Sequence, residues 1–203
     1  MDPFTQGLIG ASVPHVLASR KNAVLWAGLF GFVAGILPDL DVLIRSSSDP
    51  LLFLEYHRQF THAIIFIPVG GLFIGSIFHF LFYRKTQLSF RATWLFSTIG
   101  YGTHGILDSF TSYGTMLLWP FSEERFAFNI ISVIDPLFSI PIFLFLITVV
   151  VSKKRKYAFA ALVWAISYLS LGLLQRERVM DIGNGIAEAR GHSTVRLLVK
   201  PSF

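Results

Sequence analysis

Two acids and two histidines lie in one short polar segment of the chain. They are Asp39, Asp41, His57 and His62. A second set, His104 and Asp108, follows later in the sequence. Carboxylates and imidazoles are the usual protein ligands for zinc and for other divalent cations. We therefore predict a metal site that takes its ligands from both sets.

The spacing of these residues indicates how they meet. His104 and Asp108 are four residues apart, so they share one face of a helix and can hold one ion. Asp39 and Asp41 follow a proline and are two apart, which favours a turn or an extended stretch. They either bind one metal each or bridge two. His57 reaches the same site as His62 only if the residues between them turn back.

Two further residues are candidates for catalysis. Asp135 precedes a proline at the start of an apolar run, so it is either a helix N-cap or a general base that binds no metal. Arg58 is either an interfacial anchor or a group that orients an anionic substrate. His79 is excluded because it lies seventeen residues from His62, roughly 25 Å along a helix.

The composition indicates whether the folded chain is surrounded by water or by lipid. The 203 residues are 53% hydrophobic and only 14% charged, whereas soluble domains have roughly a quarter of their residues charged. The charges cluster between long apolar runs, which predicts an all-α polytopic membrane protein rather than a soluble helical core. The net charge of +5 comes mostly from segment ends, so we expect no nucleic-acid partner.

About six apolar segments must position the site. They are residues 4–19, 23–37, 62–83, 91–108, 134–151 and 157–174. The first two are short and form either a hairpin or, for 4–19, a helix on the membrane surface. The polar loop 39–61 contains a short interfacial helix at 51–54. We interpret the long, aromatic-rich connection 109–133 as an ordered cover on the membrane face.

If successive segments cross the membrane in alternating directions, the basic residues cluster on one side of it. The clusters are Arg20-Lys21, Arg84-Lys85 with Arg91, and Lys153 to Lys156. Such clusters mark the cytoplasmic side, so the ligands would face the extracytoplasmic side. We expect a membrane domain over 1–175 and an extramembrane tail over 176–203. The tail is predicted to be helical up to Arg190, with a strand over 195–199.

Six motifs follow one another along the chain. They are Asp2-Pro3-Phe4-Thr5-Gln6-Gly7, Leu37-Pro38-Asp39-Leu40-Asp41, His57-Arg58-Gln59-Phe60-Thr61-His62, the run from His104 to Tyr113, Trp119-Pro120-Phe121-Ser122 and Asp135-Pro136-Leu137. In this order they resemble the YdjM-like family of bacterial and archaeal inner-membrane metal-dependent hydrolases. The resemblance is dense over residues 1 to about 140. Longer relatives continue into a soluble region, so the chain is either truncated or a short member.

The resemblance implies a set of ligands. It places metal ligands at Asp39, Asp41, His57, His62, His104 and Asp108. It also places Asp2 and Gln6 beside them, as ligands or as their neighbours. Many relatives have His where this chain has Gln6, and Gln is the poorer ligand.

These observations together predict a membrane-embedded, metal-dependent hydrolase of the cytoplasmic (inner) membrane. One or two ions, zinc or manganese, would act on a lipid or lipid-linked phosphoester at the extracytoplasmic face. Two other classes stay open. A divalent metal-ion transporter would carry ionisable groups through the membrane depth. A scaffold with a structural metal would have a closed site of four ligands.

Overall fold

The computed structural model describes residues 1–18, 21–192 and 197–200, and within them it is helical, with no strand assigned. The long helices are α1 (Pro3–Leu17), α2 (Lys21–Ile36), α4 (Ile67–Thr86), α5 (Phe90–Ser109), α6 (Pro136–Ser152) and α7 (Lys156–Ala189). The short elements are η1 (Leu37–Leu43), α3 (Leu52–Tyr56), η2 (Phe60–His62) and η3 (Ile64–Phe66). The long helices lie where the sequence predicts apolar segments.

The lengths and surfaces of these helices suit a bilayer. Three stretches are long and apolar enough to cross a membrane, namely Ala23–Leu43, Ile64–Thr86 and Lys156–Ala189, and α6 is a shorter apolar helix. Large apolar side chains are exposed along α4 and α6, including Phe80 at 83% and Val151 at 80%. Water would disfavour such surfaces, whereas lipid accommodates them. The prediction of an all-α polytopic membrane protein is confirmed.

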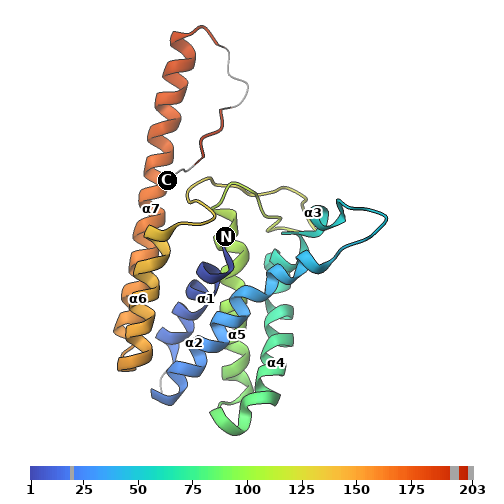
Figure 1. The fold of residues 1–203 in the computed structure, drawn as a ribbon, viewed down its shortest axis with the longest axis vertical. Coiled ribbons are helices and arrows are strands. Elements are labelled where there is room, and N and C mark those ends of the chain that lie inside the picture. Colours follow the sequence, from blue (N-terminus) through green and yellow to red (C-terminus); the bar gives the residue numbers. More distant parts are fainter. Residues whose placement is uncertain (19–20, 193–196, 201–203) are drawn as a thin grey trace.

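The helices form an antiparallel bundle (Figure 1). Helix α5 packs against α1, α2 and α4, and α6 pairs with α7. The α4–α5 and α6–α7 connections lie at one end of the bundle, and α3 lies at the other. This alternation brings the start of α1, the end of α2 and the end of α5 together at the α3 end.

Glycines allow α1, α2 and α5 to approach closely at their crossing. A Cβ atom on Gly31 would lie 2.2 Å from the carbonyl oxygen of Gly10, and one on Gly100 would lie 2.3 Å from that of Gly31. Both distances are far below van der Waals contact, so a larger residue would force the helices apart. Small residues commonly play this role between membrane helices. They fix the relative height of the helix ends that carry the polar residues.

The connection between α5 and α6 lies across the α3 end of the bundle (Figure 1). Its Leu117 carbonyl accepts a hydrogen bond from Ile64 N at 2.9 Å, and Met116 N donates to the Arg58 carbonyl at 3.0 Å. Asp2 N donates to the Val133 carbonyl at 3.0 Å. These bonds tie the connection to η3 and to the N-terminal segment, as expected for an ordered cover.

Three boundaries differ from the sequence-based expectation. Helix α4 begins at Ile67 rather than at residue 62, after the two 3-10 turns of η2 and η3, with Pro68 in its first turn. Helix α7 is continuous for 34 residues, so the segment expected over 157–174 continues without a break into the helical part of the tail. The strand expected at 195–199 begins among residues outside the described part, and residues 197–199 are not in a strand.

Candidate metal centre

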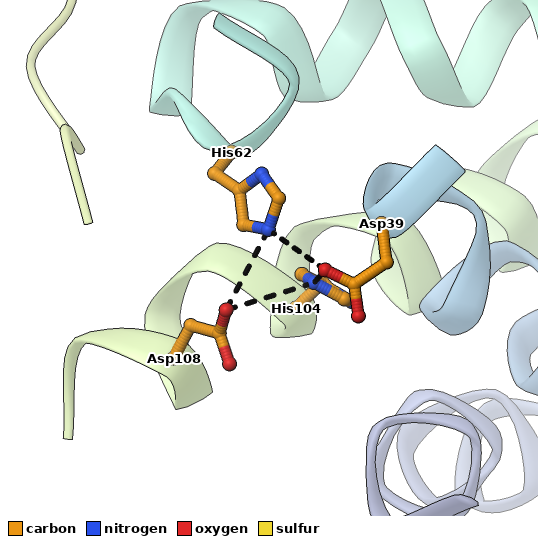
Figure 2. A group of neighbouring side chains, drawn as sticks. All are labelled: Asp39, His62, His104 and Asp108. Carbon is orange, nitrogen blue, oxygen red and sulfur yellow. Dashed lines mark hydrogen bonds and ion pairs between the residues drawn. The ribbon is translucent and has the colours of Figure 1, made fainter. Parts of the chain in front are cut away.

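Four side chains point their polar atoms at one another at the α3 end of the bundle (Figure 2). They are Asp39 of η1, His62 of η2, and His104 and Asp108 of α5. Asp39 Oδ1 lies 3.4 Å from His62 Nε2 and 3.2 Å from His104 Nε2. Asp108 Oδ2 lies 3.5 Å and 3.9 Å from the same two nitrogens. Ligands of a tetrahedral zinc lie roughly 3.3–3.6 Å apart, so the group has the dimensions of a zinc site.

Two of the four atoms that face the centre of this group make no hydrogen bond within the described part of the chain. His62 Nε2 and Asp108 Oδ2 are buried and have no hydrogen-bond partner among the described residues. Arg58 Nε lies 3.1 Å from Asp108 Oδ2, but it is not aligned for a hydrogen bond. A buried polar atom without a partner costs roughly 1–3 kcal/mol. A cation at the centre would satisfy both atoms, so the residues present fit a metal.

Contacts to Nδ1 of each imidazole orient the two rings. His104 Nδ1 donates to the carbonyl of Gly35 at 2.6 Å, which turns Nε2 toward the centre, 3.2 Å from Asp39 Oδ1. His62 Nδ1 lies 2.9 Å from Thr61 Oγ1 and 3.3 Å from Asp41 Oδ2. Histidines that bind metals usually have this second contact to a carbonyl or a carboxylate. These contacts to Nδ1 therefore fix Nε2 of each ring as the nitrogen that faces the centre.

The position of His62 strongly attracts positive charge. His62 lies just before the Ile64–Thr86 span. Burial lowers the pKa of its imidazole, but the carboxylates of Asp108, Asp39 and Asp41 outweigh burial and raise the pKa to about 10. A metal that binds here has to displace that proton.

Asp41 points to a different side of η1 from Asp39. Two residues apart in a 3-10 helix are separated by two thirds of a turn, which explains the divergence. Asp41 Oδ1 lies 2.7 Å from His57 Nδ1, while its Oδ2 accepts from Arg58 N at 3.1 Å and from Thr61 Oγ1 at 2.8 Å. The chain turns back after His57 through Arg58, whose φ is +63°. His57 and His62 therefore reach the same region, as the ligand set requires.

Three protein groups surround the Asp108 carboxylate, with Met1 and Gln6 at Oδ1 and Arg58 at Oδ2. Asp108 Oδ1 accepts from Gln6 Nε2 at 2.8 Å and pairs with the Met1 amino group. The buried Arg58 guanidinium also donates to Thr111 Oγ1 at 3.2 Å. Gln6 and Arg58 are thus neighbours of a ligand, and Arg58 is already paired with protein groups. Its expected contact with an anionic substrate stays a prediction.

Two predicted site residues lie outside the cluster. Asp2 caps α1 by accepting from Thr5 N at 2.9 Å. Asp135 caps α6, because its carboxylate accepts from Phe138 N at 3.1 Å and from the Tyr168 hydroxyl at 2.9 Å. The structure does not bring Asp135 to the ligands, and the N-cap alternative is the arrangement it shows.

The sequence analysis did not identify two hydroxyl residues that support the site. Thr61 bridges Asp41 and His62, and its carbonyl accepts from the Tyr101 hydroxyl at 2.7 Å. The position of Thr61 next to His62 is a weak signal that was available. Tyr101 gave no signal, because its role depends on the packing of η2 against α5.

Comparison with known proteins gives several matches. The model of the family described as "YdjM inner membrane protein" matches residues 1–179. The "Uncharacterized protein YfhP" of Bacillus subtilis is 32% identical over 58% of this chain and 34% of its own length. The "Inner membrane protein YbcI" of Escherichia coli is 35% identical over 47% of this chain and 54% of its own.

A "Lipoprotein signal peptidase" of Campylobacter jejuni subsp. doylei is 30% identical over 52% of this chain and 62% of its own. The chain thus matches between about a third and three fifths of the length of these relatives. No solved structure matches it. The family match and the apolar helices agree on an inner-membrane location. Because the family model covers most of the sequence, the chain belongs to the YdjM inner membrane protein family.

Proposed function

We propose that this protein is a metal-dependent hydrolase that acts at the membrane face on a lipid or lipid-linked phosphoester. The observation that carries the proposal is the group of four ligand-type atoms within 4.8 Å of one another, two of them buried without a hydrogen-bond partner among the residues that the structure describes. A bound zinc or manganese ion would polarise the scissile group and acidify a water molecule.

Different residues have different roles in the proposed reaction. Asp39, His62, His104 and Asp108 would hold the cation. Gln6 positions Asp108 through Oδ1, Arg58 pairs with its Oδ2, and the Gly35 carbonyl positions His104. The side chain of Asp39 is 21% exposed and that of His57 is 26% exposed, whereas the other ligands are fully buried. A substrate would therefore approach past Asp39 and His57.

A neighbouring cavity supports an amphiphilic, anionic substrate. It has a volume of about 550 Å³, and its lining includes Tyr113, Ile134 and Lys200. The Tyr113 ring lies 5.2 Å from the guanidinium of Arg58, so the cavity is one side chain away from the residue that holds Asp108. Apolar walls suit a lipid tail, and the ammonium group of Lys200 suits a phosphate. A relative is named "Lipoprotein signal peptidase", which supports the enzyme class and makes an amide the main alternative bond.

The proposal includes the side of the membrane. The basic connections between α4 and α5 and between α6 and α7 lie at the end opposite α3, and the positive-inside rule then favours the extracytoplasmic side for the candidate site.

Single cysteines test this sidedness, since the chain has no cysteine of its own. Ser112 lies in the cover and Ser152 ends α6, and both serines are half-buried. We expect Ser112→Cys to react with an impermeant thiol reagent in intact cells and Ser152→Cys to react only after permeabilisation. The opposite labelling pattern would place the site in the cytoplasm.

Hydrolysis is tested on the purified protein in detergent, where no ion gradient exists. We expect turnover of phospholipids or isoprenoid phosphates that is lost with a chelator and restored by zinc or manganese. Asp39→Asn should abolish turnover even when metal still binds, because the amide carries no negative charge to the site. His79→Gln is the control, because His79 lies on α4 among aromatic rings and outside the ligand group.

The proposal fails if the metal-loaded protein hydrolyses no phosphoester, ester or amide lipid. Ion movement by the same protein in vesicles would then establish the transporter. A bound ion with neither activity would establish the structural metal.

A further inference from the structure

A second group of ligand-type side chains adjoins the first. Asp39, Asp41 and His57 offer ligand atoms that lie within 4.8 Å of one another. We propose that this group holds a second divalent cation, and that the Asp39 carboxylate bridges it to the first. The inference rests on the proposed function only in that the first group binds a cation.

Asp39 has two carboxylate oxygens, and one of them faces the first position. Its Oδ1 lies 3.4 Å from His62 Nε2 and 3.2 Å from His104 Nε2, so this oxygen serves the first position. Its Oδ2 points away from His62 and takes part in no hydrogen bond with the described residues (Figure 2). Enzymes that use two metals hold them about 3.5–4 Å apart, a spacing that a bridging carboxylate can span.

Asp41 also has one carboxylate oxygen that other protein groups hold and one that can serve the second position. Arg58 N and Thr61 Oγ1 occupy its Oδ2, which leaves Oδ1 facing His57. Asp41 Oδ1 and His57 Nδ1 are 2.7 Å apart, with a proton between them. Two ligands of one first-row cation lie roughly 2.9–3.4 Å apart, so a cation has to replace this proton and separate the atoms by a few tenths of an ångström.

The two positions differ in how open they are. Three of the four protein side chains around the first position are fully buried. The second position has three protein ligands, and its Asp39 and His57 side chains are 21% and 26% exposed. Catalytic metals keep a coordination position open, whereas structural metals are closed by protein. The second position is therefore the more accessible of the two to a water molecule or a substrate.

Metal content is the first test. The full chain, purified in detergent, is saturated with Mn²⁺, freed of unbound ion and measured by elemental analysis. We expect two ions per chain in the wild type and one in both His57→Ala and His57→Gln. The Gln variant keeps a group that can hydrogen-bond to Asp41. Loss of the second ion in this variant would therefore reflect the lost ligand rather than a folding defect. His79→Ala should retain both ions.

Electron paramagnetic resonance of the wild type provides a test that needs no variant. Two Mn²⁺ ions joined by one carboxylate should give a spin-coupled spectrum at full loading and an isolated six-line spectrum in His57→Gln. One ion per chain in the wild type, or an isolated spectrum at every loading, would overturn the second site. That result would leave hydrolysis by a single ion untouched, whereas two bound ions without hydrolysis would contradict the proposed function alone.

Discussion

Replacing His104 by alanine is expected to weaken metal binding by more than about 100-fold, because groups that merely support a ligand already contribute roughly 10- to 100-fold. His104 is fully buried, and its Nε2 faces both Asp39 and Asp108. Its loss opens one corner of the tetrahedron and leaves the Gly35 carbonyl without its donor. Metal titration of the purified variant measures the change directly.

A thermal readout checks the same residue. A cation that binds only the folded state stabilises it by about 2.7 kcal/mol at 100 times its Kd. The apparent Tm of the wild type should therefore rise when zinc is added, and that of His104→Ala should not. His79→Ala is the matched control and should keep the rise. An unchanged zinc affinity in His104→Ala would remove this residue from the site.

The second large effect is expected from Gly105→Ala, which adds one methyl group to α5. A Cβ atom there would lie 2.3 Å from the carbonyl oxygen of His62, which is a backbone atom and cannot rotate away. The segment that carries His62 has to shift, so we expect metal affinity to fall at least tenfold. Overpacking of this kind typically also lowers the free energy of unfolding by about 1–3 kcal/mol.

Gly185→Ala is the matched control for this prediction. Gly185 lies inside α7, is exposed, and would have no atom within 4 Å of an added Cβ. Its replacement should leave metal binding unchanged and raise the free energy of unfolding by up to about 1 kcal/mol, because alanine favours helix more than glycine does. Equal metal affinity and equal Tm in the two alanine variants would show that the η2–α5 contact does not control the site.

The amino-acid sequence by itself was sufficient for the class of fold and for the members of the ligand group. Apolar runs separated by short charged clusters allow few structures other than membrane helices, because backbone groups in lipid must bond within their own segment. The pairing of His104 with Asp108 follows from helical spacing alone. Asp39 and His62 were recognised by residue type, and the structure places them in the same group.

Tertiary structure decided which carboxylates belong together. Asp39, Asp41 and Asp135 are all acids beside a helix end, and sequence spacing cannot rank them. The 3-10 turn of η1 directs Asp39 toward His104 and Asp41 toward His57, whereas the start of α6 uses Asp135 as its cap. These outcomes depend on contacts between segments far apart in the chain.

The same reason explains the roles of Gln6, Arg58 and Thr61. Each acts on a ligand that it can reach only after the helices have assembled, as Gln6 does on Asp108 across 102 positions of sequence. The glycines at the crossing of α1, α2 and α5 set the height at which these groups meet. Local pattern thus determined the helices and the candidate ligands, and close helix packing determined the geometry of the candidate metal centre.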